Sequence, residues 1–146
     1  LFYIVNPTSG TNNVVVEFVG AALADSVVIW TCSGVDTASP IRAFASATGT
    51  GTAVSVTVSG VQSGDVVLDM FGTDIATTNP TIGANQTHLN TGNDGAELGW
   101  GASQQPGADG GVMSWTTSLS EQWSISAVAI KALSNNARHI APLVMQ

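Results

Sequence analysis

Charged side chains are scarce in this chain of 146 residues, where they make up 9% of the sequence. Three are basic and ten are acidic, which gives a net charge of −7 at pH 7. The basic residues, Arg42, Lys131 and Arg138, are too scattered along the sequence to predict the positive stripe with which proteins bind phosphate backbones. The composition therefore argues against direct nucleic-acid binding.

Cysteine is almost absent as well, since Cys32 is the single one. It cannot close a disulfide within the chain, so the fold must be held by its core alone. Cys32 ends the apolar run Val27–Cys32, where a buried structural thiol is expected far more often than a nucleophile.

Long hydrophobic runs are also missing. No stretch approaches the ~20 apolar residues that a membrane-spanning helix needs, so we expect no membrane span. The opening Leu1–Val5 has no charged region before it and no cleavage site after it, unlike a signal peptide. The chain starts without Met on a strand-like run, and we expect it to be a processed product or to lack an earlier segment.

Apolar residues nevertheless make up 44% of the chain, so its solubility must rest on Ser, Thr, Asn and Gly. Such an uncharged polar exterior suits an extracellular or particle-bound protein. The length fits one domain with a sizeable core.

Alternation of apolar and polar residues is the main pattern, and no convincing helix is longer than a turn or two. Val14–Val19 predicts a strand with Val14, Val16 and Phe18 inward and Glu17 in water. Asp25–Ser33 is apolar on both faces, which is typical of a central strand covered on both sides. The small-residue stretch Gly34–Gly51 predicts a long loop. The other strands are expected at Leu1–Val5, Ala53–Ser59, Asp65–Gly72, Asn85–Asn90, Glu97–Gln105, Val112–Thr117 and Trp123–Leu133, with Ser118–Glu121 as a turn.

Two of these strands have clear faces. In Ala53–Ser59 we expect Val54, Val56 and Val58 to point inward. In Asp65–Gly72 we expect Asp69 to point outward, which puts Val66, Leu68 and Met70 inside. Eight or nine strands at this spacing predict an all-β antiparallel sandwich or jelly roll over residues 1–133.

The pattern breaks at Ser134, and residues 134–146 form a separate tail with a second apolar patch. One interpretation is an assembly arm that packs on a neighbouring subunit or adds a strand to its sheet. The alternatives are a strap folded back over its own domain or the start of a linker. The residues of the predicted arm are Ile140, Pro142, Leu143, Val144 and Met145.

Residues for catalysis are mostly absent. The only histidines are His88, in a polar stretch, and His139, in the tail, and neither belongs to a recognisable motif. Asp65 and Asp69 would lie ~13 Å apart on a strand, beyond the ~5 Å or ~6.5–9.5 Å of glycosidase carboxylates. The sequence therefore predicts no enzyme.

Binding residues are few. The loop aspartates Asp36, Asp74, Asp94 and Asp109 could converge on a calcium ion, although Asx turns explain them more simply and no calcium-loop spacing is present. Calcium is the one cofactor left open, and one Cys with two distant His argues against zinc.

The tryptophans favour core packing, except for Trp100, whose neighbours Gly99 and Gly101 would let a ligand approach its ring. The candidate ligand-binding residues are Trp100, Asp94 and Asp109.

Several segments carry a family resemblance, namely Tyr3–Asn12, Ala45–Gly51, Met113–Thr116 and the closing Trp123–Lys131. Together they resemble jelly-roll, lectin-like domains of secreted bacterial proteins and of tailed-phage structural proteins. The resemblance spans about residues 1–131 and implies a fold and a surface context, without any catalytic or binding residue. Such domains usually have further strands before the first hairpin, and this chain lacks them.

Three classes of function then compete. The first is a structural module of a virus particle, either a capsid decoration protein or part of a tail or fibre, that forms homo-oligomers such as trimers and contacts other virion proteins. The second is a carbohydrate-binding or adhesive domain of a secreted protein. An enzyme is the least favoured, because fold alone implies no activity. We therefore expect the protein on a virion surface or outside the cell.

Overall fold

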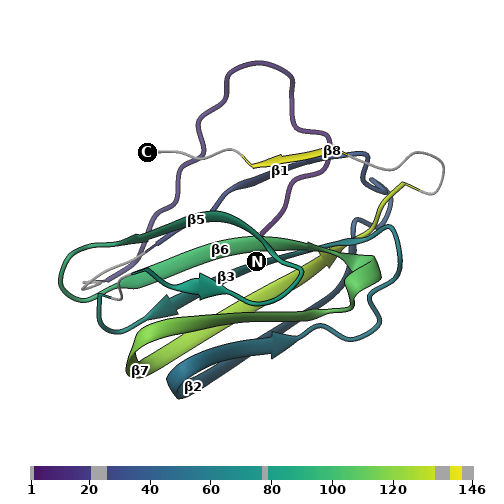
Figure 1. Cartoon of the computed structure of the whole chain (residues 1–146). Coiled ribbons are helices and arrows are strands. Elements are labelled where there is room, and N and C mark those ends of the chain that lie inside the picture. The colour runs from purple at the N-terminus through teal and green to yellow at the C-terminus, as the bar shows by residue number, and fades with distance from the viewer. Residues whose placement is uncertain (1, 21–25, 77–78, 134–138, 143–146) are drawn as a thin grey trace.

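The computed structural model describes residues 2–20, 26–76, 79–133 and 139–142, and these form an antiparallel all-β fold without an α-helix (Figure 1). This agrees with the fold class expected from the sequence. The strands are β1 (Trp30–Ser33), β2 (Ile41–Thr57), β3 (Val66–Thr73), β4 (Thr81–Ile82), β5 (Thr87–Asn93), β6 (Gly99–Pro106), β7 (Val112–Ile130) and β8 (His139–Pro142), and a single 3-10 turn, η1 (Gly107–Asp109), follows β6.

Six strands form one antiparallel sheet in the order β2-β7-β3-β6-β5, and β4 pairs with another part of β7. Strands β1 and β8 form a separate two-stranded sheet. No helix in the described ranges is long and apolar enough to cross a membrane.

The sheet folds into two layers because the long strands β2 and β7 bend at the same place. Gly51 of β2 pairs with Glu121 of β7, whereas Ala53 pairs with Thr116, so the register shifts between them. Gly51 has a φ of 134°, a conformation that glycine adopts without strain. Figure 1 shows β2 and β7 each turning back on itself, so that the second half of β2 and the first half of β7 lie beneath the rest of the sheet. This layering is consistent with a sandwich, while the jelly-roll topology stays a prediction.

The core lies between these layers. As expected from the sequence, Val54 and Val56 of β2 are buried together with Val58, which directly follows the strand, and so are Met113 and Trp115 of β7. From the other layer they meet Val67, Phe71, Ile125, Ala127 and Ala129. Because Leu68, Ala102 and Val128 are buried too, the opposite face of the sheet is also covered over part of its area.

The prediction of a loop over Gly34–Gly51 was wrong, because Ile41–Gly51 belongs to β2. Its alternation of Ala with Ser and Thr is a strand pattern with small side chains: Ala43, Ala45 and Ala47 pack against the core, and the residues between them are exposed. The predicted turn Ser118–Glu121 was also wrong, since it lies within β7 at the bend.

The N-terminal predictions were wrong for a different reason. Phe2–Val5 and Val14–Val19 form no strand within the described residues, and Val14, Val16 and Phe18 are exposed instead of facing a core. Of the expected central strand Asp25–Ser33, only Trp30–Ser33 is a strand, and Val27 is half exposed. Phe2–Val5 and Val14–Val19 have strand-like sequences but pair with no other strand among the described residues.

The tail returns to its own chain, because β8 pairs antiparallel with β1 from Trp30↔Pro142 to Ser33↔His139. This is the arrangement of a strap. The assembly arm of Ile140 to Met145 remains a prediction, and Leu143, Val144 and Met145 lie outside the described residues.

Candidate functional site

A carboxyl group lies inside the protein at Asp69 on β3, which corrects the expectation that it points outward. Its side chain follows Val67 and Phe71 onto the core face, and the residue is 2% exposed. Asp69 Oδ1 accepts hydrogen bonds from the Ser103 amide at 2.8 Å and from Ser103 Oγ at 2.7 Å. Asp69 Oδ2 accepts one from Trp115 Nε1 at 2.8 Å.

Burial raises the pKa of Asp69 to about 6, because the loss of water around the carboxylate outweighs the three hydrogen bonds that stabilise it. The cluster continues outward, where Gln86 Nε2 donates to Ser103 Oγ at 2.7 Å and Gln86 Oε1 accepts from the Ser114 amide at 2.9 Å. Ser103 is fully buried, so a substrate cannot reach its hydroxyl. The cluster therefore joins β3, β6 and β7 inside the protein.

Sequence reasoning missed this cluster because β3 is apolar on both faces. Val67 and Phe71 alternate in phase with Asp69, and this was the available signal. Because carboxylates usually face water, Asp69 was expected on the outer face of the strand.

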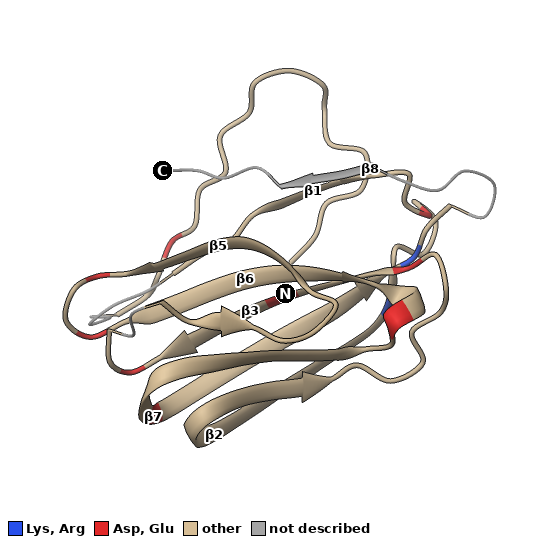
Figure 2. Ribbon diagram, viewed as in Figure 1, with Lys and Arg blue, Asp and Glu red and all other residues tan. Residues whose placement is uncertain are grey.

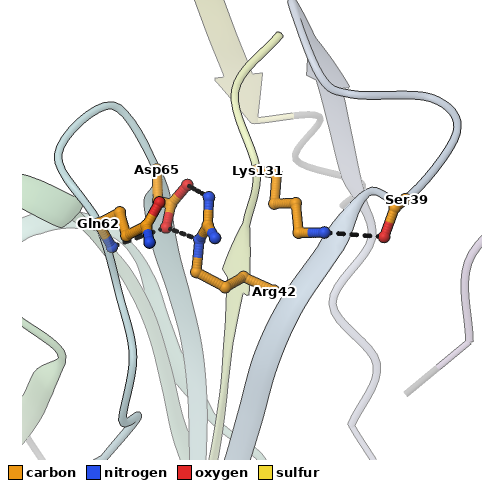
Figure 3. Close-up of polar contacts among 5 residues, drawn as sticks. All are labelled: Ser39, Arg42, Gln62, Asp65 and Lys131. Carbon is orange, nitrogen blue, oxygen red and sulfur yellow. Dashed lines mark hydrogen bonds and ion pairs between the residues drawn. The ribbon is translucent and has the colours of Figure 1, made fainter. Parts of the chain in front are cut away.

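A second polar cluster closes one end of the sheet (Figure 3). Arg42, at the start of β2, forms an ion pair through Nε with Asp65 Oδ2, and its Nη2 donates to Asp65 Oδ1 at 3.0 Å. The Gln62 amide also donates to Asp65 at 2.8 Å. Asp65 precedes β3, and β7 lies between β2 and β3, so this pair spans three strands. The hydrogen bond to Asp65 raises the pKa of Arg42.

Lys131 also makes a structural contact, since its Nζ donates to Ser39 Oγ at 2.8 Å (Figure 3). The charged positions lie mostly in the loops at the strand ends (Figure 2). Neither described basic side chain points to a ligand site.

The candidate residues Asp94 and Asp109 are not brought together. Asp94 follows β5 and precedes β6, whereas Asp109 lies in η1 after β6, and the eight residues of β6 span about 23 Å. Asp94 Oδ1 accepts hydrogen bonds from three successive backbone amides, those of Ala96, Glu97 and Leu98. These bonds lower the pKa of Asp94. The carboxylate thus caps a turn.

The four loop aspartates divide between the two ends of the sheet. The backbone amide of Asp36 donates to the carbonyl oxygen of Lys131 at 3.0 Å. Lys131 directly follows the end of β7 that lies beside the start of β3. Asp74 follows the far end of β3, on the side of Asp94, and its Oδ1 accepts from the Gln122 amide at 3.0 Å. No group of three or more metal-binding side chains occurs among the described residues.

Trp100 lies half-buried on β6, paired with Gly92 of β5. A Cβ at Gly92 would lie 2.7 Å from Trp100 Cζ2, so the ring covers the backbone of the neighbouring strand. Gly92 of the neighbouring strand therefore leaves the space that this ring occupies. Part of the indole is still open to solvent.

Cys32 and His88 lie in different sheets of the described structure. Cys32 lies half-buried in β1, and burial raises the pKa of its thiol, which disfavours the thiolate. His88 belongs to β5 and lies edge-on to Trp115, with the ring centroids 6.0 Å apart.

Exposed apolar side chains gather in the first twenty residues. Phe2 is 100% exposed and Ile4 81%, and Val15 reaches 84%. A further apolar side chain, Phe44, is 74% exposed on β2, which is one of the edge strands of the sheet.

No protein-family model matches the chain, and no curated protein or solved structure is significantly similar to it.

Proposed function

We propose that this protein is a non-enzymatic assembly module of a virus particle, either a capsid decoration protein or part of a tail or fibre. It acts through contacts between copies of itself and with other virion proteins, on the virion surface or outside the cell. The observation that carries this proposal is the pair of exposed apolar stretches Phe2–Val5 and Val14–Val19 beside a domain whose polar clusters are structural.

Apolar side chains that stay in contact with water are unfavourable. Contiguous apolar surface on a soluble protein is uncommon beyond a few hundred Å² and marks interaction sites. Phe2–Val5 and Val14–Val19 expose apolar side chains on consecutive residues. Glu17 is the one charged residue in these two stretches. A partner that covers these side chains supplies the hydrophobic free energy of association.

The proposal is tested by the mass of the purified protein in solution, measured by light scattering over a hundredfold range of concentration. We expect a symmetric homo-oligomer, with a trimer as the leading form. A chain that stays monomeric throughout this range contradicts the assembly function.

A carbohydrate-binding or adhesive function is the second candidate, and the half-open ring of Trp100 favours it. Apolar sugar faces stack on such rings, and the Asp94 turn follows β5 close by. A glycan array tests this candidate, with Trp100→Ala expected to abolish any signal. An array without signal for the unmodified protein rejects it.

A further inference from the structure

The segment Val14–Val19 has the composition of a β-strand but no strand partner among the described residues. It consists of valines, one Phe and Glu17, and β-branched and aromatic residues favour strands. Val14, Val16 and Phe18 would share one face of a strand, and all three are exposed. Such a segment can add as a further strand to the edge of a sheet.

The open edge of β2 is a suitable acceptor. Over the described chain, β2 is an edge strand along its whole length because it pairs with β7 alone. Natural edges are protected by charged side chains, Pro or bulges. From Ala43 to Thr57 the strand has no charged residue and no Pro, and its bulge lies at Gly51 and Ala53. The stretch Ala43–Gly51 is therefore an unprotected template.

Phe44 is an apolar side chain at this edge that stays largely uncovered. Ala43 and Ala45 face the core, so Phe44 faces the other side of the sheet, and it stays largely exposed there beside the buried Val128. An added strand would place apolar side chains next to Phe44 and cover it. The opposite edge strand, β5, is shorter and contains His88 and two asparagines, so it offers less apolar contact.

The side chains of the proposed contact are exposed in the single chain. Val14, Val16 and Phe18 are 57%, 48% and 51% exposed, and Phe44 at the acceptor edge is 74% exposed. Covering them in the contact supplies hydrophobic free energy of association.

We propose that Val14–Val19 of one copy adds as a strand to Ala43–Gly51 at the β2 edge of a second copy. This inference rests on the assembly function proposed above and names its contact. Figure 1 shows the N-terminal segment arching over the β1–β8 ribbon, away from β2 of the same chain. Since every copy has both the segment and the edge, repetition of the contact gives a ring when its rotation closes, and two copies can also exchange segments reciprocally.

Charge substitutions in the full chain test the contact. Val16→Lys places a charge in the added strand, and Phe44→Lys places one beside the acceptor edge, while both positions face solvent in the single chain. We expect each variant to raise the concentration at which the oligomer dissociates by at least tenfold. The matched controls Thr8→Lys, in the N-terminal turn, and Thr87→Lys, on β5, are expected to leave it unchanged.

An oligomer that is unaffected by Val16→Lys and Phe44→Lys contradicts this strand exchange alone, because assembly would then use another surface. A monomeric unmodified protein contradicts the assembly function as well.

Cross-linking separates a second copy from the same chain. In a Cys32→Ala background, a mixture of Val16→Cys and Phe44→Cys proteins is expected to give cross-linked heterodimers with a short bis-maleimide. Replacing the second variant by Glu97→Cys, at the turn between β5 and β6, is expected to give none. If the double variant Val16→Cys/Phe44→Cys cross-links only within single chains, the segment occupies its own β2 edge and the proposal is overturned.

Discussion

The carboxyl group of Asp69 makes the stability of the interior depend on pH. The folded chain binds its proton more tightly than the unfolded chain does, since the pKa rises from 3.8 to about 6 on folding. This contribution to stability is fully present below pH 4, falls as the pH rises to about 6, and is constant above that. The difference amounts to about 3 kcal/mol, at roughly 1.4 kcal/mol for each pKa unit.

The substitution Asp69→Asn is therefore expected to remove most of the fall in unfolding free energy between pH 4 and pH 7. It also lowers stability at pH 4, because an amide group would direct its own N–H at a donor, either Trp115 Nε1 or Ser103. Urea unfolding at several pH values measures both effects. Asp109→Asn, at an exposed carboxyl, is the control that should keep the slope of the unmodified protein, and an equal slope in Asp69→Asn would refute this assignment.

A glycine is required at position 101 by the core itself. A Cβ there would lie 2.5 Å from Phe71 Cε1 and 2.9 Å from Trp115 Cη2, and both rings are buried. We expect Gly101→Ala to destabilise the protein by about 1–3 kcal/mol through overpacking. At Gly72 an added Cβ meets nothing closer than 3.8 Å, so Gly72→Ala is the matched control. Equal melting temperatures for the two variants would contradict this packing.

Sequence predicts the inward face of a strand where one face is clearly polar, and fails where both faces are apolar. Val54 and Val56 alternate with Ser55 and Thr57, so their burial followed directly. In β3 the apolar residues occupy both faces, and the assumption that Asp69 faces water selected the wrong one. A buried carboxylate depends on donors from distant strands, here Ser103 and Trp115, which no local pattern reveals.

At the scale of elements, strand position depends on partners more than on local propensity. Val14–Val19 has strong strand propensity and forms no strand, whereas the weaker Ile41–Gly51 forms one because β7 pairs along its length. The sequence therefore predicted the class of the fold but misplaced the long strand at its edge.

The pairing of β8 with β1 predicts the effect of ending the chain at Leu133. The backbone of Trp30–Ser33 loses its partner, so its amides should exchange with solvent at least tenfold faster, while those of β3 and β6 keep their protection. Hydrogen exchange followed by mass spectrometry measures this. Loss of the oligomer with unchanged protection of β1 would instead support the C-terminal assembly arm.

At the scale of the whole molecule, association is expected to depend little on salt. The proposed contact joins a segment with one charge to an edge with none between Ala43 and Thr57. Raising the ionic strength screens charge pairs but leaves apolar burial intact or strengthened. Sedimentation at 0.05 M and 0.5 M NaCl should give dissociation constants within about threefold. Dissociation at high salt would assign the interface to ion pairs.

The position of β7 in the chain also governs when folding can occur during synthesis. Strand β2 pairs with β7 alone, β4 does likewise, and β3 needs β7 on one side. Ala45 lies 82 positions before its partner Ala127, and Thr57 lies 55 before its partner Val112, so these early strands leave the ribosome long before their partner exists. Strands β6 and β5 offer a sheet only to β3. The nascent chain must hold an uncharged, aggregation-prone edge open until β7 emerges, and folding through such distant pairings is slow.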